Sequence, residues 1–248
     1  MYKEIQPGNS VSEFIQCYWI SSGRYDSPCL QKIMPDGCTD IITNVYGSDS
    51  MVKETPYLIG TISKYIEVNF AGDVLMTGIR FKPGALRCFS SIPTNELTDD
   101  QAKLSDLSGS LKQAAGLIAD TMCSDSAASF LSAEELITNL VKKANPLDKL
   151  VQTTVEEIEK NCGIKTFDEI ANNISLSRRQ FERRFLEAVG VTPKRYFNIV
   201  RFNKALNSLK SGDVKNLLDA AIINGYYDHA HLIKEFKLLG GDTPSKLI

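Results

Sequence analysis

Four arginines form the densest positive cluster in the sequence: Arg178, Arg179, Arg183 and Arg184. If residues 178–189 are a helix, about 100° separates successive side chains, so Arg179 and Arg183 project away from an apolar stripe while Arg178 and Arg184 flank it. Central arginines suit base edges in the DNA major groove, and flanking ones suit backbone phosphates. A solvated helix face is the alternative, but such a face usually mixes both charge signs more evenly, so the pattern favours DNA. The stripe consists of Phe181, Phe185, Ala188 and Val189.

A second helix with a polar face is expected over residues 229–239. Ala230, Lys234 and Lys237 face outward from its apolar stripe, with His229 and His231 to the sides. His231 and Lys237 are expected to reach phosphates. The two histidines are the only ones in the chain and lie two positions apart, so on a helix they point about 200° away from each other and do not share a metal ion. No metal site is expected. The stripe of this helix is Leu232, Phe236 and Leu239.

Local signals place the first of these helices in a helix-turn-helix unit. Thr166 with Glu169 fits a capping box that starts a short helix over residues 167–173, and residues 174–176 make the turn. Ser177 with Gln180 fits a second capping box at the start of the arginine-rich helix. That helix ends at Gly190, which suits a left-handed C-cap, and Thr192-Pro193 starts another helix with a hydroxyl cap and a proline in its first position.

A second unit repeats this plan. Residues 217–223 form a short apolar helix, residues 224–227 make the turn, and Asp228 is the expected N-cap of the second helix. Residues 241–244 then mirror residues 190–193. The helix between the units, residues 193–210, would be about 27 Å long, comparable with the ~34 Å between successive major grooves on one face of DNA. One chain is therefore expected to address two adjacent grooves.

Residues 150–248 resemble the DNA-binding domain of AraC/XylS-family transcriptional regulators. About a hundred residues match in order and spacing. The matching positions are Ile170-Ala171, Leu176-Ser177-Arg178-Arg179-Gln180-Phe181-Glu182-Arg183-Arg184-Phe185, Gly190-Val191-Thr192-Pro193-Lys194-Arg195-Tyr196, Arg201, Ala205-Leu206, Ala221, Gly225-Tyr226-Tyr227-Asp228-His229-Ala230-His231-Leu232-Ile233-Lys234-Glu235-Phe236 and Thr243-Pro244.

The resemblance implies which side chains touch DNA. It places a phosphate contact near Lys194. Two departures from the family pattern are Ser175, where glycine is usual, and Asn224, where an apolar residue is usual. Ala220 replaces a usual isoleucine, which predicts looser packing of the second unit, and Arg201 is expected in an internal ion pair rather than on DNA. The implied base contacts are Arg179, Glu182 and Arg183, and more weakly His229, Ala230 and Lys234.

The first half of the chain has a different texture. Short runs rich in β-branched and aromatic residues predict strands up to about residue 90, and three- and four-residue apolar spacing predicts helices within 94–144. Asn145-Pro146 is the expected break, giving domains at 1–146 and 147–248. Residues 33–40 and 78–85 resemble segments of a domain often found before such DNA-binding domains. The resemblance implies an α+β domain, a partial cupin-like β-barrel plus helices, followed by an all-α domain with two helix-turn-helix units.

The first domain also offers a candidate effector pocket. Trp19, Asp36, Arg80 and Phe81 are its proposed lining, with Arg80 binding an anion. The structural alternative, that Trp19 is core and Asp36 belongs to an ordinary turn, is favoured for each residue singly. The helices expected at 104–119 and 127–143 either form a dimer interface or cover the sheet.

Composition excludes several functional classes. The net charge of −2 is the sum of −5 over residues 1–146, with 12 Lys and Arg against 17 Asp and Glu, and +3 over residues 147–248, with 16 against 13. The chain shows no expected transmembrane run, secretory signal or GxxxxGK[ST] loop, and no convincing Ser/His/Asp set, so neither an enzyme nor a cofactor protein is expected. Six cysteines without a CxxC pair suit reduced thiols in the cytoplasm.

The predicted function is a cytoplasmic, sequence-specific transcriptional regulator in which residues 1–146 sense an effector or dimerise. Its expected partners are double-stranded DNA, a small-molecule effector, a second copy of the chain and, for an activator, RNA polymerase. Two alternatives remain at this level. One is a protein that has lost DNA binding and acts through protein contacts, and the other is a first domain with cysteine-dependent enzymatic activity.

Overall fold

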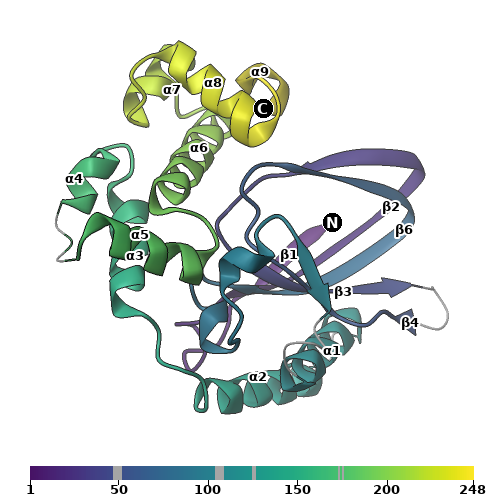
Figure 1. Ribbon diagram of the computed structural model, residues 1–248. Helices are drawn as coiled ribbons and strands as arrows, with labels where there is room; N and C mark the ends of the chain where they lie inside the picture. Colours follow the sequence, from purple (N-terminus) through teal and green to yellow (C-terminus); the bar gives the residue numbers. More distant parts are fainter. Residues whose placement is uncertain (47–51, 104–108, 125–126, 173, 175) are drawn as a thin grey trace.

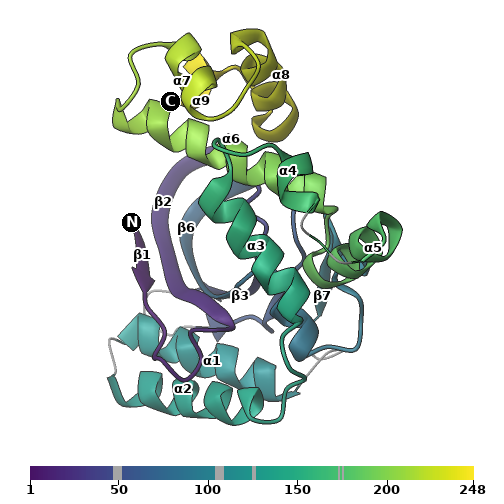
Figure 2. The same cartoon turned by 90° about the vertical axis from the view of Figure 1, so that its left-hand side faces the viewer.

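The computed structural model describes residues 1–46, 52–103, 109–124, 127–172, 174 and 176–248. An antiparallel sheet domain precedes a helical domain, which confirms the expected fold class. In Figures 1 and 2 the helices α1 (Gly109–Ser124) and α2 (Ala127–Val141) lie below the sheet, and the long helix α6 (Pro193–Ser211) lies above it.

The sheet is one curved layer whose strands pair antiparallel in the order β1-β2-β6-β3-β5-β7, with β4 on β3. Its two long strands carry register shifts between Ile15 and Cys17 and between Tyr25 and Cys29, and such bulges bend a strand. Figure 2 shows β2 and β6 curving together. The strands are β1 (Tyr2–Ile5), β2 (Ile15–Ile33), β3 (Thr39–Tyr46), β4 (Val52–Lys53), β5 (Tyr57–Ile59), β6 (Ile66–Phe81) and β7 (Gln101–Lys103).

Strand β6 runs without a break through Gly72, which adopts a φ of +70° while its pairing with Tyr25 continues the ladder. The prediction that strands end near residue 90 is wrong. Strand β7 follows, because backbone pairing with β5 holds a short polar segment extended despite its weak strand propensity.

The core of the first domain lies between the sheet and its two helices. Buried side chains of the sheet, among them Ile41, Ile79 and Phe81, pack with Leu111 and Ile118 of α1. The helices therefore cover the sheet, which is one of the two arrangements that the sequence analysis proposed for them. Residues 104–108 of the first expected helix lie outside the described residues, and short 3-10 helices η1 (Leu86–Cys88) and η2 (Thr94–Leu97) precede it.

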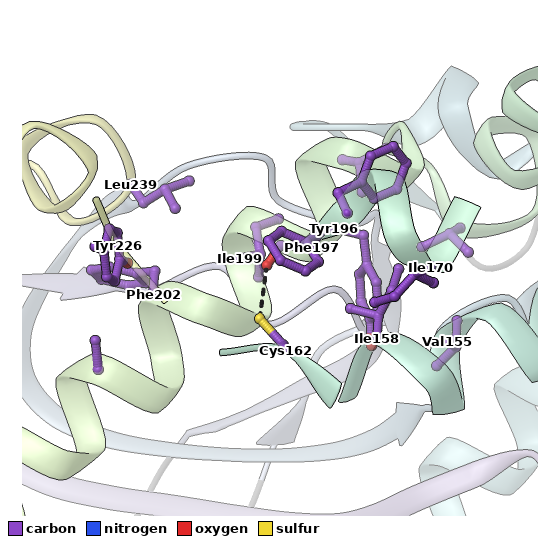
Figure 3. Close-up of a cluster of buried hydrophobic side chains, with 14 of the residues drawn as sticks. Val155, Ile158, Cys162, Ile170, Tyr196, Phe197, Ile199, Phe202, Tyr226 and Leu239 are labelled. Carbon is purple, nitrogen blue, oxygen red and sulfur yellow. Dashed lines mark hydrogen bonds between the residues drawn. The ribbon is translucent and has the colours of Figure 1, made fainter. Parts of the chain in front are cut away.

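The second domain contains α3 (Lys149–Asn161) followed by two short-helix/long-helix pairs on either side of α6. One large apolar core holds them together, and Figure 3 shows part of it, including the Cys162 thiol donating to the Phe197 carbonyl at 3.7 Å. Ala220, expected to loosen the second unit, is fully buried. The remaining helices are α4 (Phe167–Ala171), α5 (Arg178–Val189), α7 (Leu217–Ile223), α8 (His229–Gly240) and α9 (Pro244–Leu247). Within the described ranges, no helix is long and apolar enough to cross a membrane.

Candidate nucleic-acid interface

Helix α5 is positioned by caps at both ends. The Ser177 hydroxyl accepts from the Gln180 amide and donates to the Gln180 side chain, and Gly190 closes the helix at φ +92°. The preceding helix α4 has the full predicted capping box between Thr166 and Glu169. These local contacts start both helices where the sequence predicts and end α5 at the predicted residue, so the orientation of the arginines follows from the sequence. Helix α4 is shorter than predicted and ends at Ala171, because Asn172 caps it.

The arginines of α5 differ in how they are held. Arg178 pairs with Glu182 at 3.0 Å and Arg183 with Glu187 at 3.9 Å, in each case one helical turn on. The Arg178 and Arg183 side chains are 72% and 75% exposed, and such exposed pairs contribute about 0–1 kcal/mol, so DNA phosphates can replace them at little cost. Arg179 makes no ion pair within the described part of the chain and is exposed.

Arg184 is held more firmly than the other three. Its guanidinium donates to Asp148, whose carboxylate also caps α3, and this hydrogen bond raises the pKa of Arg184. A phosphate contact from Arg184 therefore competes with a contact inside the domain. The base-reading group expected from α5, which is Arg179, Glu182 and Arg183, lies together on its outer side.

Helix α8 presents a weaker set of groups. The Asp228 carboxylate caps it by accepting from the His231 amide at 2.7 Å. His229, Ala230, Lys234, Lys237 and His231 are exposed, while the His231 ring packs edge-on against Tyr226. Its Nδ1 accepts from the Tyr227 amide at 3.4 Å. Two lysines and two histidines without an arginine give this face few bidentate donors.

A buried ion pair fixes α8 to α6. Arg201 donates to both carboxylate oxygens of Glu235, at 3.1 Å and 2.5 Å, and the Tyr226 hydroxyl donates to the same carboxylate at 2.8 Å. The Arg201 guanidinium lies 4.3 Å from the centre of the Tyr226 ring. The expectation of an internal ion pair for Arg201 is confirmed.

Lys194 and Asn224 also carry expectations from the sequence. The Lys194 ammonium lies 5.2 Å and 5.1 Å from the ring centres of Phe167 and Phe197, and burial, followed by Arg201, lowers its pKa. Asn224 is buried, and its amide donates to the Ala220 carbonyl at 2.8 Å, so this departure from the family pattern ends α7 with a polar cap. Ser175 lies outside the described residues.

Three of the four proposed effector-pocket residues meet around a residue that the sequence reasoning missed, Asp40. The Trp19 indole donates to Asp40 at 2.7 Å, and Arg80 pairs with Asp40 at 3.1 Å and with Asp36 at 3.4 Å. Phe81 follows Arg80 on β6, so it lies on the opposite face in the apolar core and does not line the same site. Asp40 faces Arg80 across the β3–β6 ladder, which only the strand register reveals.

Burial and the charges within this cluster shift the pKa values of Asp40 and Arg80. Burial raises the pKa of Asp40 to about 6, against the opposing effect of Arg80. Burial alone would lower the pKa of Arg80, but the carboxylates of Asp40 and Asp36 outweigh it and raise the pKa. Since two carboxylates already satisfy Arg80, an anion would have to displace one of them.

Comparison with known proteins finds one family match in each half of the chain. Residues 3–103 match a family described as a domain of unknown function (DUF6597), and residues 170–248 match a family described as a helix-turn-helix domain. A 71-residue stretch is 35% identical to the HTH-type transcriptional activator RhaS of Klebsiella pneumoniae. Residues 170–248 are therefore similar to the helix-turn-helix domains of AraC/XylS-family regulators.

The match to RhaS covers 29% of this chain and 25% of RhaS, so this chain spans about a quarter of the length of that relative. Among solved structures, ToxT from Vibrio cholerae O395 is 11% identical with a TM-score of 0.46, covering 92% of this chain and 95% of ToxT. Wild-type ToxT of strain SCE256 bound to an unsaturated fatty acid is 13% identical with a TM-score of 0.45, covering 92% of each chain.

Proposed function

We propose that this chain is a sequence-specific DNA-binding regulator of transcription, with α5 and α8 as its two recognition helices in successive major grooves. The observation that carries the proposal is the outer face of α5, an exposed arginine-rich surface on a helix capped at both ends within an AraC/XylS-type domain. Helix α6, which is 19 residues long, connects the two helix-turn-helix units. At ~1.5 Å per residue α6 is about 28 Å long, close to one turn of DNA.

The first domain would regulate DNA binding by the helical domain. In that role it binds a small-molecule effector, or joins two copies of the chain through α1 and α2, in the cytoplasm. An effector at Trp19, Asp36 and Arg80 must compete with Asp40, because Arg80 is already paired. An activator would add RNA polymerase to the partners.

A salt titration tests DNA binding directly. Binding of the full chain to its own upstream region, followed by fluorescence anisotropy, should weaken by roughly 0.9 log units per log unit of salt for each phosphate neutralised. Lys194→Ala should weaken random and upstream duplexes alike and lower the salt slope by about one contact. Lys3→Ala, which removes one positive charge from an exposed position on β1, is the matched control and should change neither quantity. Binding without any salt dependence would exclude this function and favour a protein that acts through protein contacts.

A further inference from the structure

One short segment of the first domain touches both recognition helices. We define the brace as residues 61–65 together with Thr98 and Asp99, which lie between β5 and β6 and just before β7. Residues 61–65 are five consecutive positions, so the segment spans at most about 17 Å. Its contacts are made with the C-terminal ends of α5 and α8 and with the first turn of α6.

The brace satisfies the end of α5. The Thr61 hydroxyl donates to the Val189 carbonyl at 2.6 Å, and the Thr98 hydroxyl donates to the Gly190 carbonyl. The last carbonyls of a helix have no partner within the helix, so these two hydroxyls supply donors that the domain itself lacks. A side chain at Gly190 would be strained by the φ of +92° and would crowd Thr61, because a Cβ would lie 3.0 Å from it.

The same segment continues to α6 and α8. The Ser63 carbonyl accepts from the Arg195 guanidinium at 2.9 Å, and two residues later the Tyr65 amide donates to the Leu239 carbonyl at 2.8 Å. The Tyr65 ring packs on Gly241, where a Cβ would lie 2.4 Å from the ring. The brace thus contacts both recognition helices at their C-terminal ends and leaves their outer faces uncovered.

Asp99 joins the two parts of the brace to each other. The Asp99 carboxylate accepts from the amide and the hydroxyl of Ser63, both at 2.6 Å, and the Asp99 amide donates to the Thr61 carbonyl at 3.1 Å. Asp99 has a φ of +59°, the left-handed value for a non-glycine residue. A backbone held in this sparsely populated conformation by three hydrogen bonds makes a defined support rather than a loose loop.

We propose that the brace sets the separation and relative angle of α5 and α8, so that the protein reads two DNA elements at one spacing. This inference rests on the proposed function. Within the helical domain, α6, the shared apolar core and the Arg201–Glu235 pair connect the two units. A long helix such as α6 can bend, which lets the two units move relative to each other. The brace is a second connection between the units, so it reduces the motion that DNA binding would otherwise have to restrain.

The test compares spacings on one duplex series. The full wild-type chain selects a duplex from a random library, footprinting locates the two contacted elements, and one to three base pairs are then inserted or removed between them. Each base pair changes the rotation between the elements by about 36°, because B-DNA has about 10 pairs per turn. The wild type should prefer its selected spacing by roughly tenfold over a one-pair insertion, a loss of the size that one mismatched base pair causes.

The variant Thr61→Val/Thr98→Val removes both donors to α5 with little change of shape. Its preference for the selected spacing should fall to about threefold or less, while Lys64→Ala, at an exposed position in the same segment, should keep the wild-type ratio. A single cooperative thermal transition confirms that the variants are folded. Asp99→Asn, which tolerates the left-handed backbone and loosens only the grip on Ser63, should lie in between and serves if the double variant does not fold.

The outcomes separate the two levels of the proposal. If the wild type selects no duplex with salt-dependent affinity, the proposed function fails. If it selects a site but shows no spacing preference, or if the folded double variant or Asp99→Asn keeps the full preference, the brace has no such role and the proposed function stands.

Discussion

The two helix-turn-helix units share one plan but differ in what stabilises them and in what they present. The first unit is held by aromatic packing, in which Phe185 contacts both Phe181 and Tyr196, and it presents arginines. The second has an aromatic pair as well, Phe202 with Phe236, but it adds a buried charge pair, Arg201 with Glu235. It presents lysines, histidines and Ala230. From this difference we expect α5 to supply most of the sequence discrimination and α8 to supply mainly position on the DNA.

The largest effect is expected from breaking the charge pair. Glu235→Ala leaves the Arg201 guanidinium buried without its partner, which should cost about 3–5 kcal/mol of unfolding free energy. Urea unfolding followed by circular dichroism measures the loss. Glu187→Ala, which removes the exposed partner of Arg183, should change stability by less than about 0.5 kcal/mol. A small loss for Glu235→Ala would mean that water or Tyr226 compensates the buried arginine.

The next largest effect is expected from α5, and it is compared with the effect of a substitution on α8. Arg183→Ala should cost about 1–3 kcal/mol of specific binding, because an arginine gives bidentate contacts to guanine. Lys234→Ala on α8 should cost less than about 1 kcal/mol and should act on all sequences alike. Anisotropy titrations with the selected and a random duplex measure both. Equal losses on the two duplexes for Arg183→Ala would remove its base-reading role, and a larger loss for Lys234→Ala would reverse the division of labour.

The caps provide a comparison of intermediate size. Ser177→Ala and Asp228→Ala each remove a side-chain acceptor at a helix N-terminus and should each cost about 0.5–2 kcal/mol of stability. Thermal unfolding measures the loss, and Ser177→Asp, which restores an acceptor, should recover most of it. If only the Asp228 variant loses stability, the second unit depends on its cap and the first does not.

The smallest effect is expected from the acidic side of α5. Glu187→Gln removes a negative charge beside the DNA-facing arginines and releases Arg183 from a 3.9 Å ion pair. Binding to random duplex should tighten by about twofold at low salt, corresponding to the few tenths of a kcal/mol that an exposed i,i+4 pair supplies. The gain should vanish at high salt because the interaction is screened. Weaker binding by this variant would show that Glu187 orients Arg183 for DNA.

The features that depend on short-range contacts could be predicted from the sequence, and those that depend on contacts between distant residues could not. Ser177, Gly190, Thr192 and Asp228 act within one helical turn of their own positions, so the sequence predicted both recognition helices and their ends. The partner of Arg80 was missed because Asp40 reaches it only across the β3–β6 ladder. The brace was missed for the same reason, since Thr61 and Val189 lie 128 positions apart. Hydroxyl and amide donors in turns carry no sequence signal for a distant carbonyl.

The brace also has a practical consequence for work on fragments. A fragment that begins at residue 147 lacks Thr61, Thr98 and Tyr65, so water must solvate the carbonyls of Val189, Gly190 and Leu239. Helix ends without such partners fray more readily. The excised half would therefore accept a wider range of operator geometries than the whole protein, and a binding motif derived from it would understate how selective the intact regulator is.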